Sequence, residues 1–235
     1  MPKFTDWHIF IKSRLMQYIS LFELESYDQH EHHLPSEGKF IIAQYDQRTV
    51  IVYQAFKQSI ADYAIEHQKF GGPDYDFNRM TWLKPSFLWM MYYSGWAKKE
   101  NQENVLAIRM KREGFDEILN YAVMTSFDNE IYSDNDAWQQ QLEDSDVQLQ
   151  WEPYHDLFGN KTDRKAVKIG LKGKIQRKFN ENWIEEIKNI TPYVQKQQFL
   201  MLTHHPEMME LPHERVYTPD DLNILKKIDA TDISL

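Results

Sequence analysis

The sequence has no cysteine, and this absence excludes several kinds of chemistry. Disulfide bonds, thiol nucleophiles, iron–sulfur clusters and cysteine-ligated zinc all need that side chain. Glycine and proline are also scarce, with 8 and 9 among 235 residues, so the chain is not a flexible linker. No apolar run approaches the ~20 residues of a membrane-spanning helix. We therefore expect a folded protein that is not inserted in a membrane.

Positive charge is in deficit, with 27 Lys and Arg against 36 Asp and Glu and a net charge of −9. Proteins that bind duplex DNA nonspecifically use a basic face, whose positive charges displace the counterions condensed on the DNA. Because this chain is acidic overall, a duplex-DNA partner is not expected. The first residues, MPKFTDWHIF, lack the basic and apolar regions of a signal peptide. The expected location is therefore the cytoplasm.

The N-terminal segment differs from the rest of the chain. Its apolar residues recur at three- and four-residue spacing, which predicts an amphipathic helix. The segment then becomes polar and histidine-rich before Pro35 and Gly38. We expect a helical extension over residues 1–36 and a single α+β domain over residues 37–235. The apolar positions of the extension are Phe4, Trp7, Ile11, Leu15, Tyr18 and Phe22.

The remaining chain alternates predicted strands and helices. Residues 49–56 (TVIVYQAF) are β-branched and aromatic throughout, which predicts a strand buried on both faces. No glycine-rich phosphate loop follows a strand, so Rossmann and P-loop folds are not expected. We expect an α+β fold with a mixed or mostly antiparallel sheet. Further strands are predicted at 40–43, 103–111, 147–152 and 166–171, and helices near 60–65, 85–95, 115–122 and 175–190.

Polar groups gather immediately before the predicted buried helix, at Arg79, Thr81, Trp82, Lys84 and Ser86. The N-terminus of a helix offers unpaired amide donors that suit an anion such as phosphate. Trp82 could stack on a ring of the ligand. The alternative interpretation is a solvated helix entry with an indole in the core.

Further polar residues lie on predicted strands. Gln54 interrupts an apolar strand, where a buried amide needs hydrogen-bond partners; it either ties down a loop or faces a ligand. Tyr53 points to the opposite face of that strand. Glu152 ends a later strand on its polar face, where a carboxylate is either solvent-exposed or part of a cleft.

Histidines form two clusters, His30, His32 and His33, and His204 and His205 with His213. Either cluster could hold a metal ion, but neither lies on predicted regular structure with supporting partners. We interpret both as polar linker segments, and no metal site is expected.

Several stretches together resemble the bacterial and fungal domain-of-unknown-function 4291 family. They occur in the order IIAQYDQRTVIVYQAF, FNRMTWLKPSFLWMMYYSGWA, NVLAIRMKREGF, VQLQWEPYHDL, KAVKIGL and HERVYTPDDL. The resemblance covers roughly residues 39–228. That family implies no function of its own.

A second resemblance, carried by element order, is to ADP-ribosyltransferase-type folds, which hold NAD on a split, mostly antiparallel sheet. It implies that Glu152 is the catalytic carboxylate with Gln54 beside it. It implies further that NAD contacts Tyr53, Arg79, Thr81, Trp82, Lys84 and Ser86, without a metal. The first-strand arginine or histidine usual in that fold is absent, since Gln54 occupies the nearest position.

The resemblance implies an NAD-consuming enzyme that transfers ADP-ribose to an unknown acceptor, either RNA or protein. A carboxylate near the ribose can stabilise the oxocarbenium-like state that forms when the nicotinamide bond breaks. The absent arginine or histidine favours an alternative, a non-catalytic module that binds a nucleotide, an RNA end or a protein. RNA phosphate-end processing on the same fold is a third possibility.

Overall fold

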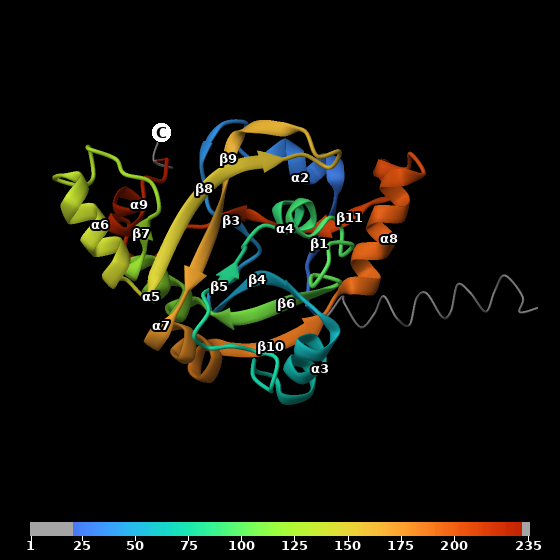
Figure 1. The fold of residues 1–235 in the computed structure, drawn as a ribbon. Helices are drawn as coiled ribbons and strands as arrows, with labels where there is room; N and C mark the ends of the chain where they lie inside the picture. The colour runs from blue at the N-terminus through green and yellow to red at the C-terminus, as the bar shows by residue number, and fades with distance from the viewer. Residues whose placement is uncertain (1–20, 232–235) are drawn as a thin grey trace, which may run out of the picture.

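The computed structural model describes residues 21–231 and confirms an α+β fold with mixed, mostly antiparallel sheets (Figure 1). The strands are β1 (Leu24–Ser26), β2 (Gly38–Lys39), β3 (Ile42–Ala43), β4 (Thr49–Phe56), β5 (Thr81–Leu83), β6 (Asn104–Lys111), β7 (Val123–Met124), β8 (Val147–His155), β9 (Lys161–Leu171), β10 (Ile184–Asn189), β11 (Glu210–Pro212) and β12 (Arg215–Val216). The α-helices are α2 (Tyr27–His33), α3 (Gln58–His67), α4 (Phe87–Ser94), α5 (Arg112–Tyr121), α6 (Asn135–Asp144), α7 (Gly173–Lys178), α8 (Thr191–Leu202) and α9 (Asn223–Lys227).

Two sheets form the framework. One is antiparallel, with strand order β10-β6-β4. The other has the order β2-β9-β8-β7 and is built on the long antiparallel hairpin of β8 and β9. Within residues 21–231, parallel pairing is confined to β2 with β9 and β7 with β8. None of the helices in this part of the chain combines the length and apolarity needed to cross a bilayer.

A short segment, residues 81–84, connects the two sheets. Its first three residues form β5 and pair antiparallel with β9. The next residue, Lys84, exchanges two backbone hydrogen bonds with Tyr53 of β4, at 2.7 and 3.1 Å. The segment that the sequence predicts as a polar cluster is therefore fixed to both sheets.

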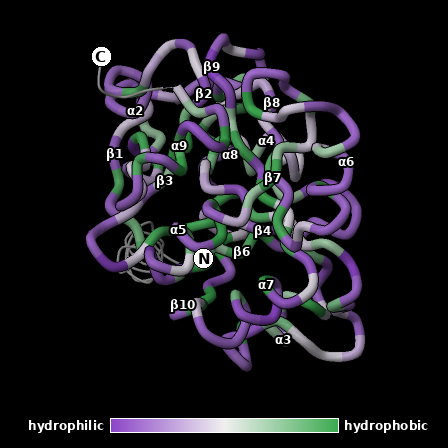
Figure 2. The backbone as a smooth tube through the Cα atoms, turned by 90° about the vertical axis from the view of Figure 1, so that its left-hand side faces the viewer, coloured by the Kyte–Doolittle hydropathy of each residue, from purple (hydrophilic) through white to green (hydrophobic). Residues whose placement is uncertain are grey.

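Strand β4 is buried on both faces, as its sequence predicts. Val50 and Val52 belong to one hydrophobic cluster, whereas Ile51 and Tyr53 belong to another on the opposite side. Figure 2 shows the hydrophobic stretches on central strands such as β6 and the hydrophilic ones on peripheral turns. Burial on both faces explains why this strand reads as a continuous apolar run rather than an alternating one.

Helix α4 is nearly buried because most of its residues are apolar, with Phe87 to Met91 all inaccessible to solvent. Gly95 ends the helix in the left-handed conformation, at φ 58°. The prediction of a short buried helix that ends at this glycine is confirmed.

The predicted helix over residues 175–190 is wrong in its second half. Helix α7 and a π-helical turn (Phe179–Trp183) end at residue 183, and β10 follows. The backbone groups of β10 pair with β6, so the open sheet edge outweighs the helical spacing of Ile187 and Ile190. Pro192 lies in the first turn of the next helix, α8.

Residues 1–20, which carry most of the predicted helical extension, lie outside the described residues. Residues 21–36, the remainder of that prediction, pack on the domain through β1, which pairs with β11, and through α2. Arg164 of β9 binds the Glu31 carboxylate with two hydrogen bonds of 2.7 Å. Because Arg164 is buried, this ion pair attaches α2 firmly to the larger sheet.

Substituting Gly114 by alanine tests a very close contact in the core. A Cβ atom at this position would lie 2.3 Å from the Trp183 ring, which is itself buried. We expect the G114A variant to lose about 1–3 kcal/mol of unfolding free energy in urea, although alanine favours helices. Glu113→Ala, at an exposed position of the same helix, is the control and should change stability by less than about 0.5 kcal/mol. Equal stability of the two variants would contradict this packing.

Candidate functional site

The main candidate site is a cavity of about 550 Å³ beside residues 79–84. The end of β4 forms one wall, and residues 74–84 form a second. Tyr93, Asn101 and Gln102 close it from the segment that starts at the end of α4, and Gln176 reaches it from α7. A volume of this size is typical of small-molecule sites in proteins.

Gln54 is buried in the wall of this cavity. Its Nε2 donates to the Thr81 hydroxyl at 2.6 Å and to the Trp82 carbonyl at 3.2 Å. Its Oε1 has no hydrogen-bond partner within residues 21–231, and the same holds for Oε1 of Gln102. The contacts of the amide nitrogen agree with the interpretation that Gln54 fixes a neighbouring loop, and its oxygen is buried without a partner among the described residues. Two such acceptors suit a ligand that carries N–H groups.

Gln176 holds the loop before β5. In the amide orientation that satisfies both of its polar atoms, it donates to the carbonyls of Phe77 and Arg79 at 3.2 and 3.3 Å and accepts from the Tyr75 hydroxyl at 3.2 Å. Gln176 is 1% exposed. The sequence reasoning missed Gln176 and Tyr75, because only the tertiary fold brings α7 to this loop.

Lys84 is a buried cation on the cavity wall, 3% exposed. Its Nζ lies 3.9 Å from the centre of the Tyr93 ring and has no carboxylate partner within the described residues. Burial, reinforced by Lys168 and Lys99, lowers the pKa of Lys84 from 10.5 to about 7. An ammonium buried without a carboxylate partner is costly, and the lowered pKa reflects that cost.

Arg79 adds a second cation to the cavity wall, and its side chain is exposed. A third cation, Lys57, is paired with Asp74 at 3.0 Å. Asp76 accepts hydrogen bonds from the backbone and side chain of Asn78 at 2.8 and 3.0 Å. Arg79 and Lys84 are therefore the cavity cations without a carboxylate partner in the described part of the chain.

Trp82 lines the cavity with its indole partly exposed. It pairs in register with Gly170 of β9, where a Cβ atom would lie 2.3 Å from the Met80 sulfur and 3.1 Å from the Trp82 ring. The glycine therefore allows the indole to lie close against the strand. Lys168 lies 5.0 Å from the centre of this ring.

Glu152 reaches this neighbourhood indirectly. Its carboxylate lies 3.2 Å from Lys168 Nζ, but Glu152 is not among the residues that line the cavity. The structure therefore brings Gln54, Arg79, Thr81, Trp82 and Lys84 together around one cavity, whereas Glu152 is connected to it only through Lys168, which contacts both Glu152 and the Trp82 ring.

Tyr53 and Ser86 belong to a different, fully buried cluster. Ser86 Oγ contacts the Tyr154 hydroxyl at 3.4 Å, and Tyr53 is 0% exposed. The carboxyl group of Glu214 accepts a 2.7 Å hydrogen bond from the amide of Phe87, at the start of α4. Burial raises the pKa of Glu214 well above its usual value. This cluster supports α4 from behind and does not open into the cavity.

The segment after α4 is conformationally strained. Trp96, Ala97 and Asn101 have positive φ angles of 58°, 63° and 62°, and Asn101 lines the cavity. Such conformations cost of order 1–3 kcal/mol each and concentrate at functional sites. Trp96 borders a different cavity, together with Leu88 and Tyr92.

Comparisons with known proteins identify a family but no activity. The model of a family described as a domain of unknown function, DUF4291, matches residues 40–217. That range includes β4, the whole segment before α4, Glu152 and Glu214. A comparison with curated proteins finds no match to this chain.

Proposed function

This chain belongs to the DUF4291 family, and we propose that its cavity binds NAD and that the protein transfers the ADP-ribosyl group of NAD to an acceptor. One observation carries the proposal: the buried, unpaired Lys84 shares a cavity with Arg79, an accessible indole and two unpartnered amide oxygens. This combination matches a ligand that has a diphosphate, aromatic rings and amide or amine N–H groups.

Each part of such a ligand has a complementary group in the cavity. Lys84 and Arg79 would neutralise the diphosphate through charge-assisted hydrogen bonds. The Trp82 ring offers a face for nicotinamide or adenine. Gln54 Oε1 would accept a hydrogen bond from the carboxamide or the adenine amino group, which would remove the cost of a buried acceptor without a partner.

The proposed reaction breaks the bond between the nicotinamide nitrogen and C1′ of the ribose. Nicotinamide leaves with the electron pair, and C1′ bonds to an oxygen or nitrogen of the acceptor, whose proton passes to a base. Glu152 is the proposed carboxylate that stabilises the positive charge on the ribose. In this proposal a bound nucleotide draws Lys168 toward its phosphates, which frees Glu152 from the present 3.2 Å pair.

A specific observation favours a second function, which is binding of a nucleotide without turnover. Glu152 is neutralised by Lys168 and stands outside the cavity wall, and no arginine or histidine occupies the position of Gln54. On this alternative the fold retains the ligand-binding wall but lacks the catalytic carboxylate.

Incubation with NAD distinguishes the two functions. We expect NAD to raise the melting temperature of the protein, because a ligand that binds only the folded state stabilises it by about 2.7 kcal/mol at 100 times its Kd. We also expect nicotinamide release, measured by chromatography. Release should fall by at least roughly 100-fold in Glu152→Gln, whereas the thermal shift should remain.

Glu185→Gln is the matched control, since Glu185 is exposed and lies on β10 away from the cavity. Unchanged release in Glu152→Gln would remove the catalytic assignment. A thermal shift without any release would establish the binding module. No shift with NAD would contradict the transferase, and no shift with NAD or with other nucleotides would contradict both functions.

A further inference from the structure

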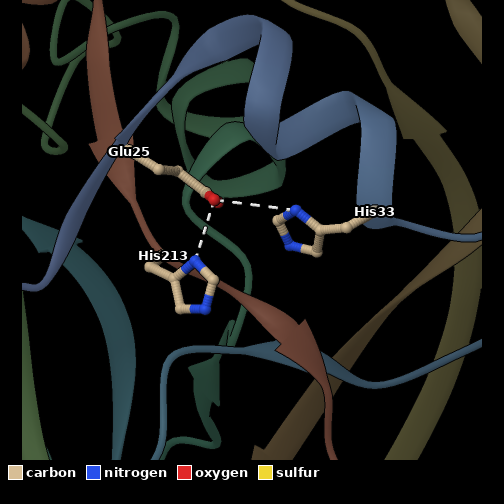
Figure 3. A group of neighbouring side chains, drawn as sticks. All are labelled: Glu25, His33 and His213. Carbon is tan, nitrogen blue, oxygen red and sulfur yellow. Dashed lines mark hydrogen bonds and ion pairs between the residues drawn. The ribbon is translucent and has the colours of Figure 1, made fainter.

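A second group of polar side chains lies outside the cavity. It comprises Glu25 of β1, His33 at the end of α2 and His213 between β11 and β12, which point toward one another (Figure 3). Glu25 Oε2 lies 2.8 Å from His213 Nδ1 and 3.6 Å from His33 Nδ1. None of these three residues lines the cavity around Lys84.

Regular structure holds each of the three residues in place. The antiparallel pair of β1 and β11 sets Leu24 opposite Pro212, and the amide of His213 donates to the Glu23 carbonyl at 2.7 Å. Ser26 then caps α2 with a reciprocal side-chain contact to Gln29, so that the helix ends with His33 beside the same strand pair. The group is therefore preorganised by its backbone.

We propose that Glu25, His33 and His213 bind a divalent transition-metal ion with the ligand preferences of Zn²⁺. Two imidazoles and a carboxylate are a usual ligand set for this ion, with bonds of about 2.0–2.2 Å. Tetrahedral bonds of this length place ligand atoms about 3.3 Å apart. The observed separations of 2.8 and 3.6 Å lie on either side of that value.

Neighbouring groups orient the ligands as outer-shell partners do in metal sites. His33 Nε2 lies 2.7 Å from the backbone carbonyl of Glu214 and donates to it, while Nδ1 lies 2.7 Å from the Gln29 carbonyl and 3.6 Å from Glu25 Oε2. His30, fully buried, contacts Glu25 Oε1 with its Nδ1 at 3.0 Å. That contact leaves Glu25 Oε2 directed at His33 and His213.

The site is accessible and has room for a further ligand. The side chains of His33 and His213 are 32% and 36% exposed. His213 also lines a cavity of about 180 Å³ together with Glu23, Gln44 and Asp46. Three protein ligands and an adjacent cavity leave one tetrahedral position for water.

A proton competes with the metal for His33. Its Nδ1 lies 2.7 Å from the Gln29 carbonyl as well as near Glu25. The proposal requires that a metal ion binds Nδ1 of His33 in place of the hydrogen bond to the Gln29 carbonyl.

The test uses full-length protein without an affinity tag. We expect isothermal titration with Zn²⁺ alone to show one ion per chain, and Zn²⁺ to raise the melting temperature. Co²⁺ should give the visible absorption bands of a tetrahedral site. Affinity should fall at least ~10-fold in His33→Gln and in His213→Asn.

His32→Ala is the matched control, because His32 lies on the same helix, is exposed and stands outside the group. It should bind Zn²⁺ as wild type does. Absence of stoichiometric binding to the wild-type protein would overturn the proposal, as would variants that bind as tightly as the control. The melting temperature of each metal-free variant shows whether that variant folds. If a variant does not fold, the titration of the wild-type protein decides the proposal.

Discussion

Replacing Lys84 with methionine should weaken NAD binding by roughly 10- to 100-fold and at the same time make the protein more stable. The loss of affinity follows because the variant lacks the charge-assisted hydrogen bonds to phosphate. The gain in stability, on the order of 2–4 kcal/mol at pH 7, follows because a buried, unpaired ammonium is removed and an apolar chain of similar length fills its place. Opposite effects on binding and stability are typical of a residue retained for function.

Titration with NAD and urea denaturation measure the two effects separately. Lys99→Met is the control, because Lys99 also approaches the Tyr93 ring, at 4.9 Å, but is exposed. Its stability should change by less than about 0.5 kcal/mol. A Lys84→Met protein that is less stable than wild type and binds NAD normally would show that Lys84 serves the fold rather than a ligand.

The pH dependence of the stability gain gives an internal check. The folded protein releases the Lys84 proton at about pH 7, whereas the unfolded chain holds it to about 10.5. The unfolded state therefore binds more protons between these values, and wild-type stability rises with pH through that window. The advantage of Lys84→Met should be fully present below pH 7 and shrink toward pH 10.5. NAD affinity of the wild type should fall as pH rises through 7.

Substituting Glu214 by glutamine should raise stability at pH 8 by roughly 1–3 kcal/mol and leave it almost unchanged at pH 4. Burial raises the pKa of Glu214, so the folded protein keeps a proton that the unfolded chain loses above its usual pKa near 4.5. The contribution of this group is fully present below that value and is lost as pH rises toward the folded pKa. Glutamine has no such dependence and still accepts from the Phe87 amide.

Glu214→Ala provides the contrast. It leaves the Phe87 amide without its acceptor and creates a cavity beneath α4, which should cost about 2–5 kcal/mol relative to Glu214→Gln at all pH values, since neither variant titrates at this position. Urea denaturation of both variants at pH 4, 6 and 8 measures these effects. A wild-type protein that loses no stability relative to Glu214→Gln between pH 4 and pH 8 would contradict a buried, protonated Glu214.

The part of the cavity wall that is local in sequence could be predicted. Thr81, Trp82 and Lys84 are neighbours in the chain, and an amide in an apolar strand, Gln54, is a visible exception to its surroundings. The long strands β4 and β6 were predictable as well, because β-branched and apolar residues fill them.

The remaining parts depend on contacts between distant segments. Gln176 contacts the loop at residues 74–80 only because α7 follows β9. The spacing of residues in the sequence does not predict this contact. His33 and His213 meet through a three-residue strand pair, β1 with β11, which is too short for a sequence pattern to reveal. The strand β10 carries helical spacing and becomes a strand because β6 offers it an open edge.

A crystal structure of the protein, from crystals grown with millimolar NAD, tests most directly the central claim that the cavity binds NAD. The account predicts electron density for the dinucleotide in the 550 Å³ cavity, with a phosphate oxygen within hydrogen-bond reach of Lys84 Nζ and a ring against Trp82. Density for NAD elsewhere on the protein, or a cavity that holds only water at saturating NAD, would contradict it.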